Sequence, residues 1–294
     1  TAADAMSTGP HAWSPWRQAL IRELVGKVQH LLEAGGMDAD RAVRLEERIA
    51  EVRGRAGPGE AVERFIEQMP RSYFTSVDPV TAASHVGMLT PSPGSTEVRT
   101  AARRGARRGA HQLTVVAADH PGLLAQIAGA LALNGLNILS AQVFTTGDGV
   151  ALDLFDVVPA FRGEVDEDRW RRFRGDLRKA LEGRLSLEYR VREKRRHYRA
   201  PRADVPVEVQ VDNAVSDFST VIEVGAPDRI GLLFELALAF HELELDVHVA
   251  KVATYGTRVI DAFYVRDLLG RKVEDPQRVA AIERHIVDRL DDLA

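Results

Sequence analysis

The chain has 294 residues, a formal net charge of −4, 45% hydrophobic residues and 28% charged residues. This composition is typical of a globular protein with room for two or three domains, and its charge argues against a nucleic-acid partner. Because the chain holds no cysteine, disulfides, thiolate metal sites and cysteine nucleophiles are excluded, which favours a cytoplasmic location. No apolar run is long enough to cross a bilayer and no signal peptide opens the chain, so no membrane partner is expected. Since residue 1 is threonine, we expect further domains upstream.

Residues 1–90 are expected to form an α-helical segment. Apolar residues recur at helical spacing in three stretches, which predict helices over 14–36, 40–52 and 60–68. The stretch from Met69 to Phe74 predicts a break before a further short segment at 79–88. Residues 91–111 combine Pro, Gly and Arg with few large apolar side chains, which indicates a linker or solvated loop.

The rest of the chain contains an internal repeat. Asp119-His120-Pro121-Gly122-Leu123-Leu124 recurs as Asp228-Arg229-Ile230-Gly231-Leu232-Leu233, 109 residues later (119 to 228). Each copy follows a short apolar strand and opens an amphipathic helix. Such a repeat defines the unit of architecture, and we place module one at 112–213 and module two at 214–294.

Each module is predicted to be ferredoxin-like. In module one we expect strands at 112–118, 137–146 and 149–158, helices at 121–134 and 167–182, and a closing strand at 205–211. In module two we expect strands at 219–225, 246–254 and 258–266 and helices at 229–242 and 275–292. This order predicts an α+β fold, with the α-helical N-terminal segment followed by two βαββαβ modules. Module two has no residues left for its closing strand, so that sheet edge is expected to be open or covered from elsewhere.

The first strand-to-helix turn of each module is the candidate ligand site. Backbone N–H groups at a helix start favour a carboxylate, and Gly122 and Gly231 allow a ligand to approach the backbone closely. Asp119 and Asp228 add a carboxylate suited to an ammonium group. Together these groups match a free amino acid. Further polar contacts are expected from two residues at the start of the second strand, which we place near the same end of the sheet: Asn137 and Asp246.

A simpler interpretation stays open for these turns. An aspartate just before a helix is a common N-cap, and a glycine there can serve only the close crossing of helix and strand. The nine histidines show no metal-ligand spacing, and no nucleophile elbow or phosphate loop occurs, so neither a metal site nor a catalytic residue is expected in this chain.

The repeated segments resemble ACT domains, small modules that bind amino acids and regulate enzymes. The residues that carry the resemblance are 116–124 with 134–138, and 225–236 with 245–254. Residues 245–254 and 258–265 also resemble the C-terminal end of the bifunctional uridylyltransferase/uridylyl-removing enzymes that act on the PII signalling protein. The segment from Met69 to Phe74 resembles the end of their HD phosphohydrolase domain.

The resemblance implies a regulatory region that senses glutamine, or another small amino acid, in nitrogen signalling. The transferase of that family needs a Gly-Ser turn followed by an Asp-x-Asp pair. Gly94-Ser95 stands in a Pro-rich loop without such a pair, and no adjacent His-Asp metal pair occurs. Both catalytic centres are therefore absent from these residues, and the magnesium that they use is expected only in other domains of the parent enzyme. A free-standing amino-acid-binding regulator and a purely structural pair of modules are the alternatives.

A basic stretch near the end of module one, with seven Arg and Lys residues from Arg190 to Arg202, is the sharpest charge cluster. Charge runs are usually solvated faces, and this is the interpretation we favour. An RNA-binding role is disfavoured because the predicted strands at 137–146 and 149–158 lack the aromatic-rich motif of RNA-recognition modules.

Overall fold

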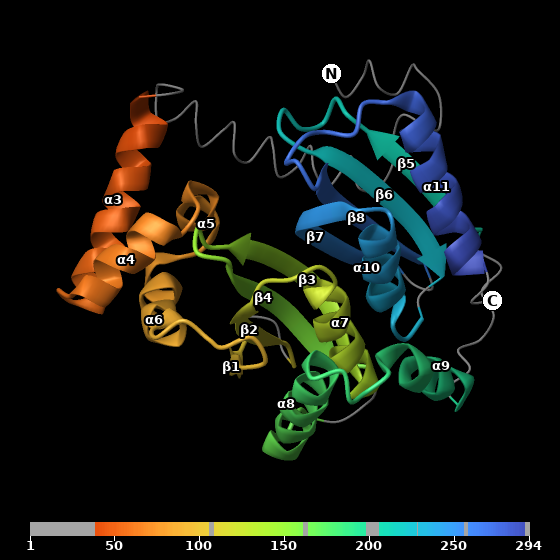
Figure 1. The fold of residues 1–294 in the computed structure, drawn as a ribbon, viewed down its shortest axis with the longest axis horizontal. Helices are drawn as coiled ribbons and strands as arrows, with labels where there is room; N and C mark the ends of the chain where they lie inside the picture. The colour runs from red at the N-terminus through yellow and green to blue at the C-terminus, as the bar shows by residue number, and fades with distance from the viewer. Residues whose placement is uncertain are drawn as a thin grey trace. The chain divides into compact units, whose positions relative to one another are not determined.

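The computed structural model describes residues 39–105, 109–160, 164–197, 206–227, 229–255 and 258–291 (Figure 1). They form two compact units, 39–62 with 71–84, and 63–70 with 85–291. The helix predicted over 14–36 and the candidate residue Asp228 lie outside the described residues. Every helix in these ranges is too short or too polar to span a membrane.

The first unit is helical, as predicted. It contains α3 (Ala39–Ala56) and α5 (Arg71–Ser76), and α4 (Glu60–Gln68) and α6 (Pro79–Leu89) connect it with the second unit. The break expected at 69–74 is wrong in part, because Tyr73 and Phe74 are buried on the short helix α5 with their rings edge to face. Arg48 donates from Nε to the carbonyl of Phe74 (2.6 Å) and from Nη2 to that of Val77 (2.7 Å). These bonds satisfy carbonyls that a helix end leaves without partners.

The second unit is built on one antiparallel sheet. Its strands follow one another in the order β1-β2-β4-β3-β7-β8-β6-β5. Their bounds are β1 Val98–Arg104, β2 His111–Ala118, β3 Leu136–Thr145, β4 Val150–Pro159, β5 Glu208–Asp212, β6 Thr220–Pro227, β7 Leu245–Tyr255 and β8 Arg258–Asp267. The first four strands are neighbours in one half of the sheet and the last four in the other half. We therefore assign β1 to module one and β5 to module two, although both lie outside the bounds expected for those modules. The predicted α+β fold with two repeated modules is confirmed.

Module one takes its edge strand from the predicted linker. β1 pairs with β2 along its whole length, from Val98 opposite Ala117 to Arg104 opposite His111. The expectation of a loop over 91–111 is therefore wrong for 98–104. The stretch resembles a loop because an outer strand needs few large apolar residues, and its exposed arginines protect the open edge from further pairing.

Module two takes its edge strand from the segment expected to close module one. The strand predicted at 205–211 is observed as β5, but it pairs with β6, from Glu208 opposite Gly225 to Asp212 opposite Val221. The position of module one's closing strand was therefore wrong, and the open edge expected in module two is covered. β1 already occupies the edge of module one, and the short connection from β5 to β6 favours a local hairpin.

The two modules join at a seam between β3 and β7. Ala141 lies opposite Ala250, and these residues are 109 positions apart (141 to 250), as are the two copies of the repeated turn. The seam therefore lies on an approximate two-fold axis. Both strands carry a register shift at equivalent places, between Ile138 and Ser140 and between Val247 and Val249.

Helices pack across this seam on one face of the sheet (Figure 1). α7 (Leu123–Leu133) lies beside α10 (Leu232–Glu242), and α8 (Glu167–Leu181), α9 (Leu187–His197) and α11 (Pro276–Asp291) surround the pair. A close contact lies at Gly129, where a Cβ would be 2.9 Å from the ring of Phe234 and 3.2 Å from Leu187. Glycine is thus required for α7, α9 and α10 to meet.

Candidate ligand-binding site

The two repeated turns have the same backbone geometry. Gly122 and Gly231 precede α7 and α10 with left-handed φ angles of 85° and 77°, a conformation that favours glycine. Neither helix has a side-chain cap among the described residues. The carboxylate of Asp119 accepts instead from Thr145 Oγ1 at the end of β3 (2.9 Å). The interpretation of Asp119 as an N-cap is therefore wrong, and its carboxylate lies at the sheet end beside the turn.

A buried aspartate lies beside this turn. Asp153 on β4 is 1% exposed and shares the helix-facing side of its strand with the core residues Ala151 and Phe155. Its Oδ1 atom has no hydrogen-bond partner among the described residues. Burial raises the pKa of Asp153 well above its usual value, and the charges of Asp119 and Asp246 raise it further. A hydrogen bond from the backbone N–H of Phe144 lowers the pKa, but this effect is smaller. A protonated Asp153 can donate a hydrogen bond to a ligand oxygen.

Asp246 reaches this turn from the other module. Because β7 runs antiparallel to β3, the start of β7 lies beside the end of β3, where Thr145 binds Asp119. Asn137 is at the opposite end of β3, opposite Val158. The expectation that Asn137 and Asp246 lie near the turn of their own module is therefore wrong. Because of the strand directions, Asp246 lies at the end of the sheet that carries the turn of module one, and Asn137 lies at the end that carries the turn of module two.

Two histidines of module two complete the surroundings. A Cβ on Gly122 would lie 3.6 Å from the ring of His241 at the end of α10. His248 Nε2 is 3.5 Å from Asp246 Oδ2. Burial lowers the pKa of His248, and the charge of Arg266 lowers it further, whereas the charge of Asp246 raises it. The net lowering favours a neutral imidazole at pH 7. We call this set corner one: Asp119, Gly122 and Asp153 of module one, with His241, Asp246 and His248 of module two.

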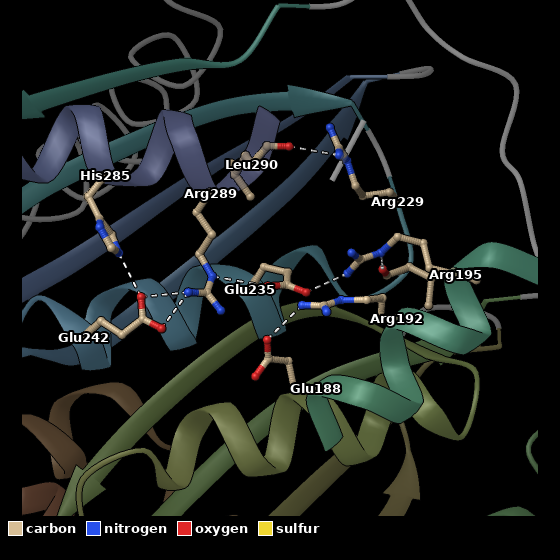
Figure 2. Close-up of polar contacts among 10 residues, drawn as sticks. Glu188, Arg192, Arg195, Arg229, Glu235, Glu242, His285, Arg289 and Leu290 are labelled. Carbon is tan, nitrogen blue, oxygen red and sulfur yellow. Dashed lines mark hydrogen bonds and ion pairs between the residues drawn. The ribbon is translucent and has the colours of Figure 1, made fainter. Parts of the chain in front are cut away.

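We call the equivalent place at the turn of module two, around Gly231, corner two, and it is covered by α9. A Cβ on Gly231 would lie 2.7 Å from Val191 Cγ1 and 3.4 Å from Arg195 Nη2. Arg195 donates from Nε to the carbonyl of Ile230 (3.2 Å). It also donates from Nη2 to Glu235 Oε1 (3.0 Å), as Figure 2 shows. The basic stretch was interpreted as a solvated face. This holds for Arg190, Arg192 and Arg196, which are exposed, but is wrong for Arg195, whose side chain is 14% exposed.

Corner one gathers carboxyl groups, imidazoles and the N–H groups at the start of α7. The described residues contain no group of three or more His, Asp or Glu side chains that could hold a metal ion. A cavity of about 440 Å³ lies elsewhere, at the connection between β8 and α11, and none of its lining residues belongs to either corner. The polar groups of corner one can donate and accept hydrogen bonds.

Replacing Asp153 with asparagine tests the buried carboxyl group. Because burial raises its folded-state pKa, Asp153 stabilises the fold fully below its ordinary pKa of 3.8, and that contribution is lost as pH rises through the raised value. The D153N chain has no such loss, so we expect it to be more stable than the wild type by about 1–3 kcal/mol at pH 8, with a smaller gain at pH 4.5. Urea denaturation at both pH values measures the difference. An equal effect at both values would contradict the raised pKa.

Comparison with known proteins agrees with this architecture. The model of the ACT domain matches residues 111–174, and the model of the ACR family N-terminal ACT domain matches residues 215–290. A bifunctional uridylyltransferase/uridylyl-removing enzyme of Gluconobacter oxydans is 36% identical over 99% of this chain and 31% of its own length. Enzymes of the same name from Nitrobacter winogradskyi and Bradyrhizobium diazoefficiens are also 36% identical, over 99% and 96% of this chain and 32% and 31% of their own lengths.

The chain thus spans about a third of the length of these relatives. Its two ACT matches fall on the two modules built around the repeated turns. The chain therefore contains tandem ACT domains and corresponds, over 99% of its length, to part of the bifunctional uridylyltransferase/uridylyl-removing enzymes.

Proposed function

We propose that the chain is the amino-acid-sensing regulatory region of a bifunctional uridylyltransferase/uridylyl-removing enzyme, with glutamine as its ligand. The observation that carries the proposal is the buried Asp153 at corner one, whose Oδ1 has no hydrogen-bond partner among the described residues. The charges of Asp119 and Asp246, which come from different modules, both raise the pKa of Asp153. A buried polar atom without a partner is costly, so a ligand that satisfies it would bind favourably.

The groups of corner one suit a molecule that carries both charges. The carboxylate of Asp119 would bind the α-ammonium group, and the backbone N–H groups behind Gly122 would bind the α-carboxylate at the positive end of α7. A protonated Asp153 and a neutral His248 would donate to the side-chain carbonyl of glutamine. The choice of glutamine rests on the resemblance to the enzyme family, whereas the preference for an amino acid rests on these groups.

A ligand at corner one would act as a regulator because it touches both modules. Its affinity would depend on how the modules pack across the β3–β7 seam, so binding would favour one arrangement of the seam over another. In the longer protein this shift would bias attachment and removal of UMP on the PII protein. Magnesium would serve the catalytic domains of that protein.

Calorimetric titration with glutamine and a panel of other amino acids tests the proposal. We expect saturable heat with glutamine, and an affinity reduced about 10–100-fold in D119A, because a hydrogen bond to a charged group contributes about 1.5–3 kcal/mol. The matched control is D168A, since Asp168 is an exposed aspartate in the first turn of α8 and outside corner one. Absence of heat and of a thermal shift at millimolar glutamine would contradict the proposal.

A further inference from the structure

The repeat makes the two corners comparable position by position. Ala132 is the equivalent of His241, 109 residues earlier, and each lies near the glycine of the other module. A Cβ on Gly122 would meet the ring of His241 at 3.6 Å, and a Cβ on Gly231 would meet the Cβ of Ala132 at 3.7 Å. The smaller alanine leaves room at corner two that a histidine fills at corner one. Val191 and Arg195 of α9 lie in that position.

Corner two also differs in charge. Glu235 is the equivalent of Gln126, which contacts His120 Nε2 at 3.3 Å in module one. The Glu235 side chain is 6% exposed and accepts from Arg195 through Oε1 (3.0 Å) and from Arg289 Nε through Oε2 (3.2 Å). Figure 2 shows the two guanidinium groups approaching this carboxylate from opposite sides, from α9 and from α11. The Glu235 carboxylate and the Ile230 carbonyl both accept from Arg195, and two neighbouring acceptors of this kind match the forked donors of a guanidinium group.

We propose that corner two is a guanidinium-binding site that the chain fills with its own Arg195, which makes α9 an intramolecular ligand of module two. Corner one is then the corner open to a free ligand, and the tandem binds one amino acid per chain. The binding of one amino acid per chain at corner one rests on the proposed function, whereas the guanidinium site at corner two does not.

α9 is held by both modules at once. Lys194 donates from Nζ to the carbonyl of Leu133 at the end of α7 (2.7 Å), and Leu187 packs near Gly129. Arg195 and Val191 contact the turn of module two. The position of α9 therefore depends on the packing of α7 against α10, and a ligand that shifts the seam would also shift α9. Removal of α9 would expose a second corner.

Chemical rescue of the R195A chain tests the guanidinium site without any amino acid. We expect R195A to lower Tm by about 5–10 °C, since one partner of a buried ion pair is lost. Millimolar ethylguanidinium should restore part of this loss, and ethylammonium at the same ionic strength should not. The control is R192A, because Arg192 is an exposed residue of the same helix whose pairing with Glu188 lies within α9. We expect R192A to change Tm by less than about 2 °C and to show no rescue.

Amide hydrogen exchange of the wild-type chain gives a second test that needs no variant. We expect the amides of 190–195 to be protected as strongly as those of α10. Complete exchange of the α9 amides within seconds would overturn the proposal. It would also be overturned if ethylguanidinium and ethylammonium raised the Tm of R195A equally, or if R195A and R192A had the same Tm. A positive rescue with no glutamine binding would refute only the proposed function, and glutamine binding with no rescue would refute only the guanidinium site.

Discussion

Replacement of Glu235 with alanine is expected to lower the free energy of unfolding by about 3–5 kcal/mol, because it leaves two partly buried guanidinium groups without their shared carboxylate. The side chains of Arg195 and Arg289 are 14% and 17% exposed, so solvent compensates little for the loss. Since these residues come from α9 and α11, the substitution loosens the contacts of both helices with α10. Urea denaturation followed by circular dichroism measures the change.

Glu242 provides the control for this prediction. It lies on the same helix and also pairs with Arg289, at 2.7 Å, and with His285, at 2.9 Å, but its side chain is 45% exposed. Exposed ion pairs contribute about 0–1 kcal/mol, so E242A is expected to stay within that range of the wild type. Equal destabilisation by E235A and E242A would contradict the claim that burial makes the Glu235 pairs important.

The paired substitutions G231A and G122A are expected to differ by about 1–3 kcal/mol, with G231A the less stable. Both place a side chain on a left-handed backbone, so they share the cost of that strain. Only at Gly231 would the added methyl lie 2.7 Å from Val191 Cγ1, and a valine side chain has little freedom to move aside. At Gly122 the nearest atoms, those of His241, are at an ordinary contact distance.

A double-mutant cycle isolates this contact. Combining G231A with V191A should recover most of the additional loss, whereas combining G122A with V191A should give additive changes. Equal stabilities of the two glycine variants, or additivity in both cycles, would show that α9 does not cover corner two in solution.

Most of the fold could be predicted from the sequence because the repeat and the hydrophobic periodicity act locally. The glycine turns and the helices behind them follow directly from the repeated segments. The edge strands were misplaced for a physical reason. β1 is exposed over most of its length and rich in arginine, so it lacks the apolar alternation of a strand, and the partner of β5 depends on which sheet edge is free.

The candidate site was predictable only within one module. Asp119 and Gly122 belong to the repeated turn, but the approach of Asp246 and His248 depends on the antiparallel seam between modules. Asp153 was missed although a signal was present, because an aspartate in the middle of an apolar strand recurs in module two as Asp261, opposite Val224 as Asp153 is opposite Val115. Neither the spacing of the motifs nor the composition of the sequence indicates that α9 covers corner two and leaves corner one open.

Hydrogen exchange of the chain with and without millimolar glutamine tests the central claim most directly, because it locates the ligand. We expect slower exchange in two segments that meet at corner one, residues 119–126 and 245–249, and no further protection of the turn at 229–233. Unchanged exchange throughout, or protection confined to 229–233, would contradict the assignment of corner one as the ligand site.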